Sequence, residues 1–198
     1  MLIVATHNSH KTEEIRTILC DFFDNITDLT TQGNHAAPEE DGNTFEANAR
    51  IKALAASRRF PSAIVLADDS GLEVDSLNDF PGVQSARYAG LGATDRDNRI
   101  KLLRALEGIT ERRARFVCVI VLAKAGEVLA TFDGTCEGLI AEEQTGQSGF
   151  GYDTLFIPEG YYESFGLLRG EIKNTISHRA RALEKLKAWF ETTAPGML

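Results

Sequence analysis

Apolar and polar residues follow two rhythms along this chain, one typical of strands and the other typical of helices. Continuous or alternating apolar runs predict strands, whereas apolar residues at three- and four-residue spacing predict helices. In chain order, the pattern predicts a strand at 2–6, a helix carrying Ile15, Ile18, Leu19 and Phe22, a helix from Thr44 to before Pro61, strands at 62–68 and 72–77, a helix from Thr94 to before Gly108, strands at 115–123, 128–132 and 135–140, and a helix from Ser177.

Strands alternate with helices in the first half of the chain and follow one another directly in the second half. This order predicts an α/β fold with a mixed sheet, because helical crossovers join parallel strands and short turns join antiparallel ones. The segment 124–127, Lys-Ala-Gly-Glu, predicts a hairpin turn between two of the later strands. No linker divides the chain, so we expect a single domain over residues 1–198.

Composition limits the classes of function. A net charge of −8 disfavours binding of a long nucleic acid, which depends on many Lys and Arg side chains. The longest apolar run, residues 116–123, is too short to cross a membrane, and the first residues lack a signal-peptide pattern, so we expect a cytoplasmic protein with no membrane partner. The 3 cysteines form no CxxC pair, which favours buried thiols in a reducing compartment.

The apolar run that ends at Ala67 is followed by Asp68, Asp69, Ser70 and Gly71. One interpretation is a hairpin turn, in which a glycine supplies a positive φ and the aspartates accept hydrogen bonds. The other is a metal site. Neighbouring side chains of a strand point to opposite faces, so only one of these aspartates is expected to bind an ion, and the acid-rich segment 38–42 offers a second carboxylate.

Basic side chains lie at the predicted starts of the first and last helices, where the helix dipole favours anions. Lys11 follows the segment 6–10, Thr-His-Asn-Ser-His, and Arg179 follows Ser177 and His178. A bound polyanion, paired with these cations and with free backbone N–H groups, would explain them. Solvated surface side chains would explain them equally well.

The glycine-rich segment 146–153, Gly-Gln-Ser-Gly-Phe-Gly-Tyr-Asp, matches neither a P-loop nor a dinucleotide fingerprint. Its backbone could approach a flat ligand while Phe150 stacks on it, or it could be a turn with two core aromatic residues. Together with a carboxylate pair and cationic helix starts, it favours a nucleoside phosphate site. Mg²⁺-assisted attack of water on phosphorus is the chemistry that suits such a site.

Six ordered blocks of this sequence resemble the inosine triphosphate pyrophosphatase family. The blocks, between Leu2 and Leu186, are ATHNSHKTEE, GNTFEANARIKA, LADDSGLEVD, PGVQSARYAG, SGFGYDTLF and ISHRARAL. The resemblance implies Mg²⁺-dependent hydrolysis of non-standard purine nucleoside triphosphates, namely inosine, deoxyinosine and xanthosine triphosphate (ITP, dITP and XTP), to the monophosphate and pyrophosphate. It also implies an elongated mixed sheet flanked by helices, two lobes with a central cleft, and a homodimer.

The resemblance further implies roles for individual residues. Asp69 would be the proton acceptor, and Glu40 and Asp69 would hold the metal. The first loop would bind phosphates through Thr6, Asn8 and Lys11, beside His7, Ser9 and His10, and Ser70 would contact the substrate. The nucleoside pocket would be lined by Phe150, Gly151, Tyr152, Asp153, Lys173, His178 and Arg179. Residues of secondary importance would be Lys52, Arg87 and Asp68.

Four residues depart from the family pattern, which bears on rate and substrate preference: His7, Ala47, Gln84 and Thr154. N–H groups of His178, Arg179 or the backbone would donate to the C6 oxygen of inosine and leave the adenine amino group without a partner. Two alternatives stay open, a non-catalytic purine nucleotide-binding module and a related pyrophosphatase for modified pyrimidine nucleotides.

Overall fold

Six strands form one mixed sheet in the computed structural model, which describes residues 1–33 and 36–193. The strands are β1 (Leu2–Val4), β2 (Ile26–Asp28), β3 (Ile64–Val74), β4 (Arg113–Lys124), β5 (Glu127–Ile140) and β6 (Phe156–Pro158). Their order across the sheet is β2-β1-β3-β4-β5-β6. β1 runs parallel to β2 and β3, whereas β5 and β6 are antiparallel. The predicted α/β class with a mixed sheet is therefore confirmed.

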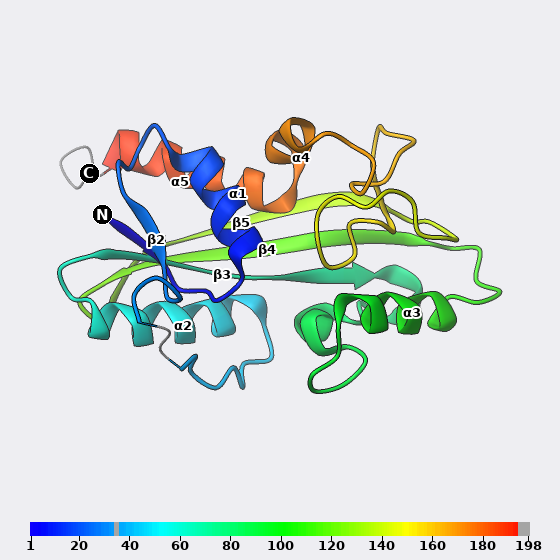
Figure 1. Cartoon of the computed structure of the whole chain (residues 1–198), viewed down its shortest axis with the longest axis horizontal. Helices are drawn as coiled ribbons and strands as arrows, with labels where there is room; N and C mark the ends of the chain where they lie inside the picture. Colours follow the sequence, from blue (N-terminus) through cyan, green and yellow to red (C-terminus); the bar gives the residue numbers. More distant parts are fainter. Residues whose placement is uncertain (34–35, 194–198) are drawn as a thin grey trace. The chain divides into compact units, whose positions relative to one another are not determined.

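Five α-helices and two 3₁₀ helices complete the described secondary structure (Figure 1). They are α1 (Ser9–Leu19), α2 (Phe45–Arg59), η1 (Asp75–Leu77), η2 (Gly82–Arg87), α3 (Asp95–Ala105), α4 (Gly170–Ile176) and α5 (His178–Thr193). Thr44 caps α2, and Thr94 and Asp97 form the capping box predicted at the start of α3. In the described residues, no helix has the length and apolar character of a membrane span.

The chain divides into two compact units. The first unit comprises the described residues of Met1–Asp69, Cys118–Gly134 and Arg179–Leu198. The second comprises Ser70–Val117 and Thr135–His178. Strands β3, β4 and β5 each contribute residues to both units.

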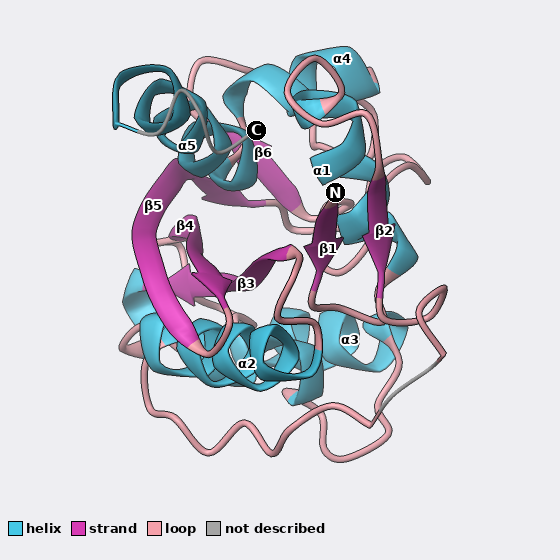
Figure 2. Cartoon of the chain, turned by 90° about the vertical axis from the view of Figure 1, so that its left-hand side faces the viewer, coloured by secondary structure: helices cyan, strands magenta, loops and turns pink. Residues whose placement is uncertain are grey.

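Helices cover both faces of the strands in the first unit (Figure 2). Alternate strand residues pack to opposite sides, as the pleat requires. One layer joins α1 and α5 to the strand residues Leu2, Val4, Ile64, Leu66, Cys118, Ile120 and Leu122. The other layer joins α2 to Ile3, Ala5, Val65, Ala67, Val121 and Ala123. Burial on both faces explains why the strands of this unit are nearly continuous apolar runs.

Asp28, the last residue of β2, is tied to two threonines of the first unit. Its carboxylate accepts hydrogen bonds from the Thr31 N–H at 3.0 Å and from the Thr12 hydroxyl at 3.1 Å. Burial alone would raise the pKa of Asp28, but these hydrogen bonds lower it below the ordinary value of 3.8. The carboxylate therefore stabilises the fold in its charged form.

The second unit has its own core, built around aromatic rings. The Phe116 ring centroid lies 4.6 Å from that of Phe156, which lies 5.6 Å from that of Phe165. Leu72 and Leu102 are fully buried in the same cluster. Within this unit, Figure 1 shows α3 and α4 on opposite sides of the strands.

Two strand predictions are wrong in the same way. The segments 62–68 and 72–77 are not two strands, because β3 continues through Asp68–Gly71 to Val74, and this excludes the hairpin turn considered there. The segments 128–132 and 135–140 are likewise one strand, β5, after the predicted hairpin turn, where Ala125 and Gly126 have positive φ. Short strands β2 and β6 and helix α4 were not predicted.

Candidate active site

The residues singled out from the sequence fall into two groups, one in each compact unit. The first group includes the loop before α1, Glu40, Lys52, the two aspartates of β3 and Arg179. The second group includes the glycine-rich turn, Lys173 and His178.

Asp68 and Asp69 point to opposite faces of β3, as predicted for neighbouring strand residues. Asp68 bonds to side chains of α1 and α5, whereas Asp69 bonds to side chains of α2. Both are buried. One stretch of strand therefore supplies two carboxylates to two different environments.

Asp68 is the centre of an ion cluster in the first unit. Its Oδ2 lies 3.0 Å from Lys11 Nζ and 2.9 Å from Arg179 Nη2. Arg179 also donates to Glu14, and only 1% of its surface is exposed. Although burial opposes charge on both groups, Lys11 and Arg179 hold the pKa of Asp68 far below its usual range, and Asp68 raises the pKa of Arg179. We therefore expect both groups to stay charged over the whole working pH range.

This cluster gives a third explanation for the cations at the helix starts. Neither a bound polyanion nor solvent is needed to balance Lys11 and Arg179, because Asp68 and Glu14 lie beside them. The expectation of free backbone N–H donors at the start of α1 is also corrected at two positions. Asn8 Oδ1 accepts from the N–H groups of His10 and Lys11, at 3.0 and 3.4 Å.

The rest of the first loop combines an internal hydrogen bond with exposed side chains. Thr6 Oγ1 accepts from the Asn8 N–H at 3.1 Å, so these two side chains order the loop. His7, Ser9 and His10 lie at the surface. The imidazoles and the Ser9 hydroxyl are thus exposed in the segment where phosphate binding was predicted.

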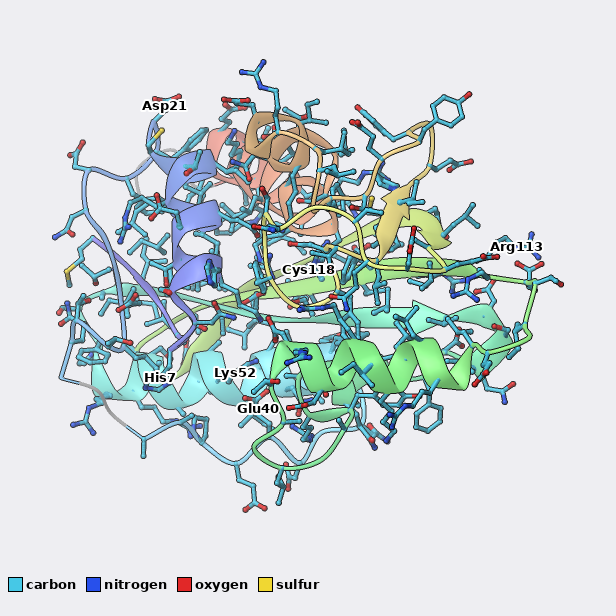
Figure 3. The ribbon with its side chains drawn as sticks, turned by 45° about the vertical axis from the view of Figure 1, so that its right-hand side comes forward. His7, Asp21, Glu40, Lys52, Arg113 and Cys118 are labelled. Carbon is cyan, nitrogen blue, oxygen red and sulfur yellow. The ribbon has the colours of Figure 1, made fainter. Side chains whose placement is uncertain are left out.

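Glu40 and Asp69 converge on the ammonium group of Lys52. Glu40 and Lys52 are labelled in Figure 3. Lys52 Nζ lies 3.0 Å from Glu40 Oε2 and 2.9 Å from Asp69 Oδ1. Burial disfavours charge on Lys52, but the nearby carboxylates of Asp69, Asp68 and Glu40 raise its pKa. Burial raises the pKa of Asp69, an effect that Lys52 opposes and Glu40 reinforces. Asp69 is consequently a stronger base than a free aspartate.

The chemistry of this pair fits a hard divalent cation. Two carboxylates already meet at one cationic centre, and Mg²⁺ commonly takes one or two carboxylates while keeping water and phosphate oxygens as its other ligands. In residues 1–33 and 36–193, no group of three His, Cys, Asp or Glu side chains is arranged to hold a metal by itself. A cation here would therefore depend on ligands from a substrate or from water.

Asn48 was not among the residues predicted from the sequence. It lies on the buried face of α2, 1% exposed, one turn before Lys52. Its Oδ1 accepts from the Gly42 N–H at 2.9 Å, and its Nδ2 donates to Asp69 Oδ2 at 3.4 Å. It thus links the acidic loop to Asp69. The sequence held a signal, since a polar amide three residues after Phe45 and four residues before Lys52 is unusual on a buried helix face.

In the second unit, the glycine-rich turn is closed around the carboxylate of Asp153. Asp153 Oδ2 accepts from the Phe150 N–H at 2.9 Å and from Lys173 Nζ at 2.6 Å. The Lys173 ammonium also lies 4.8 Å from the centroid of the Phe150 ring. Asp153 and Lys173 are buried, whereas Phe150 is half-buried. Tyr152 is thus a core residue, as one interpretation predicted, whereas Phe150 is partly exposed.

The other predicted residues of the second unit make contacts elsewhere as well as in this turn. His178 stacks on Phe116, with ring centroids 4.8 Å apart and an interplanar angle of 14°. Tyr152 donates its hydroxyl to the Ser85 carbonyl oxygen at 2.9 Å. Ser70 lies half-buried in β3, and Arg87 ends η2 at the surface.

Comparison with known proteins covers almost the whole chain. The model of the Ham1 family matches residues 2–189. A protein from Clostridium perfringens named dITP/XTP pyrophosphatase is 47% identical over 93% of this chain and 94% of its own length. One of the same name from Desulfotalea psychrophila is 45% identical over 95% of this chain and 84% of its own length.

The fold of this chain also matches those of solved relatives. The solved structure of a HAM1 protein from Coxiella burnetii is 39% identical, covers 96% of this chain and 98% of its own, and superposes with a TM-score of 0.85. These matches confirm the resemblance carried by the six sequence blocks, and the chain belongs to the Ham1 family.

Proposed function

We propose that this chain hydrolyses non-standard purine nucleoside triphosphates, namely ITP, dITP and XTP, to the monophosphate and pyrophosphate. Relatives at 45–47% identity over nearly the whole chain carry the name dITP/XTP pyrophosphatase, which supports the substrate class. The observation that carries the reaction type is the convergence of Glu40 and Asp69 on one cationic centre. A binding module without catalysis would not need a buried carboxylate of raised basicity.

Mg²⁺ is the cofactor that we propose, held by Glu40 and Asp69. When bound, such an ion offsets the charge that develops on phosphate oxygens during attack by water. Lys52 holds both carboxylates in one place and adds a positive charge beside them. Asp69, the buried carboxylate of the pair, accepts the proton of the attacking water.

Nucleoside recognition falls to the groups of the second unit. The half-buried Phe150 ring offers a stacking surface for a purine. The Asp153 carboxylate is already bonded to Lys173 and to the Phe150 N–H, and is 3% exposed. It is therefore not a ready acceptor for the 2-amino group of guanine, which removes one way in which guanine nucleotides would be favoured. All three side-chain nitrogens of Arg179 are bonded to carboxylates, which supports a positioning role for it.

Product analysis tests the reaction and its cofactor. ITP with Mg²⁺ should give pyrophosphate and inosine monophosphate in equal amounts, and removal of divalent ions with a chelator should abolish turnover. Orthophosphate as the first product would contradict the proposal. The turnover panel should include xanthosine and methylated pyrimidine triphosphates, because faster turnover of the pyrimidines would refute the substrate class.

Replacement of the proposed base separates catalysis from binding. Asp69→Asn keeps the size of the side chain but removes its proton-accepting charge, so kcat should fall by about a hundredfold or more. Binding of inosine monophosphate should change little, as measured by calorimetry. Full turnover by this variant would exclude Asp69 as the base.

We further propose that the chain acts in the cytoplasm as a single domain and a homodimer. Light scattering after gel filtration tests the oligomeric state, and a single cooperative thermal transition tests the domain count. A monomer at the concentration of the activity assay would refute the dimer.

A further inference from the structure

Two residues of α3 hold the peptide group of Gly151 in the glycine-rich turn. Asp95 Oδ2 accepts from the Gly151 N–H at 2.6 Å, and Arg99 Nη1 donates to the Gly151 carbonyl oxygen at 2.7 Å. The two side chains are four residues apart, so they project from the same face of the helix. One helix face thus engages both polar groups of a single glycine.

The Arg99 side chain makes a second contact that fixes its direction. Its Nε donates to Gln144 Oε1 at 2.7 Å, so the guanidinium fork joins the segment before the turn to the turn itself. Arg99 is half-buried. Hydrogen bonds from a charged donor with two partners are stronger and more directional than neutral ones.

The turn needs external support at this position. Gly151 has a φ of +59° and Gly149 a φ of +77°, and because glycine lacks a Cβ, its backbone can leave these conformations easily unless other groups hold it. Phe150 and Asp153 are bonded to each other, and Tyr152 is anchored by Ser85. Among these described contacts, the peptide group of Gly151 is held by side chains from α3, next to the partly open Phe150 ring.

We infer that Asp95 and Arg99 are positioning residues for nucleoside recognition, which keep the Phe150 ring in the orientation that stacks on a purine. The inference rests on the proposed function, because it assigns this turn to the nucleoside. Loss of the clamp lets the turn populate other conformations, and the apparent affinity falls by the fraction that stays competent. The phosphate-binding and catalytic groups of the first unit are untouched.

The test combines kinetics with hydrogen exchange. Arg99→Ala should raise the KM for ITP and the Kd for inosine monophosphate by about tenfold, with kcat within about twofold of the wild type. Inhibition by pyrophosphate should not change. Amide exchange in residues 149–153 should accelerate in the same variant.

Three further variants separate positioning from general damage. Arg96→Ala removes the same charge from an exposed position of the same helix and should leave KM and exchange unchanged. Asp95→Ala should resemble Arg99→Ala, whereas Asp95→Asn keeps an acceptor oxygen and should restore most of the affinity.

The outcomes distinguish this inference from the proposed function. Wild-type protein that neither binds inosine monophosphate nor hydrolyses ITP would overturn both. Normal wild-type binding, with KM and exchange unchanged in Arg99→Ala, would overturn the inference alone. A lowered melting temperature with unchanged KM would also overturn it, because a purely structural contact would behave in that way.

Discussion

Gly149 is a position where a single methyl group should damage the nucleoside turn. A Cβ added there would lie 2.0 Å from Asp153 Oδ2, 2.8 Å from its Cγ and 2.9 Å from its Cβ. Rotation of the Asp153 side chain could move its Oδ2 and Cγ away, but its Cβ is fixed by the backbone and cannot move in that way. Gly149→Ala must therefore displace the carboxylate that Lys173 and the Phe150 N–H share.

The matched control is two residues further along the same turn. Gly151→Ala places an alanine at a positive φ, but its Cβ would meet nothing within 4 Å. Backbone strain alone then costs about 1–2 kcal/mol. Gly149→Ala carries the same strain and also weakens a charged hydrogen bond of about 1.5–3 kcal/mol, so its loss of stability should be about 2.5–5 kcal/mol.

Urea titrations followed by circular dichroism measure the free energy of unfolding of both variants and the wild type. KM for ITP should rise more in Gly149→Ala than in Gly151→Ala, because the first displaces a group beside the Phe150 ring. Equal losses of stability in the two variants would refute this reasoning, since they would show that the turn relaxes around the added methyl group at no cost.

Three other predictions concern the first unit. Lys52→Met leaves two carboxylates facing each other, so its free energy of unfolding, measured with a chelator present, should fall by about 3–5 kcal/mol. Mg²⁺ should raise the melting temperature of this variant more than that of the wild type. An equal response of the two proteins would count against a metal at this pair. Asp28→Asn should destabilise the protein by about 1 kcal/mol at pH 7. Because the folded pKa of Asp28 lies below 3.8, its stabilisation is present above pH 3.8 and fades as the pH falls further, so the two unfolding curves should converge in acid and a constant gap would disprove the assignment. Of the three thiols only Cys20 is exposed, so iodoacetamide should modify one site in the native protein, as mass spectrometry would show.

Periodicity located most helices and the long strands because their burial patterns are regular. Periodicity predicted a break in the strand at Asp68 to Gly71, but these polar and small residues lie inside β3. Turn chemistry is the usual meaning of such residues, but here Asp68 and Asp69 are balanced by charges from helices distant in sequence. Short elements such as β2 carry too few residues to show a period.

The site was predicted in part for the same physical reasons. Spacing along a strand correctly placed Asp68 and Asp69 on opposite faces. The partners of those acids could not be derived locally, since Lys11 and Arg179 reach Asp68 only through tertiary folding. Lys52 and Asn48 lie at helical spacing in the sequence, yet their burial on α2 and their common contact with Asp69 follow only from the tertiary structure.

The pairing of β3 with β1 has a chemical consequence. Leu2 lies opposite Ile64 and Val4 opposite Leu66, and this alignment decides which aspartate faces which helix. Insertion or deletion of one residue between Ile64 and Asp68 would exchange the two acids, because strand side chains alternate. The acid made strongly acidic by two cations and the acid made more basic by burial would then trade environments. The register of these two strands therefore sets the acid strength of each aspartate. A register shift of a single residue would abolish the activity although every functional group is still present.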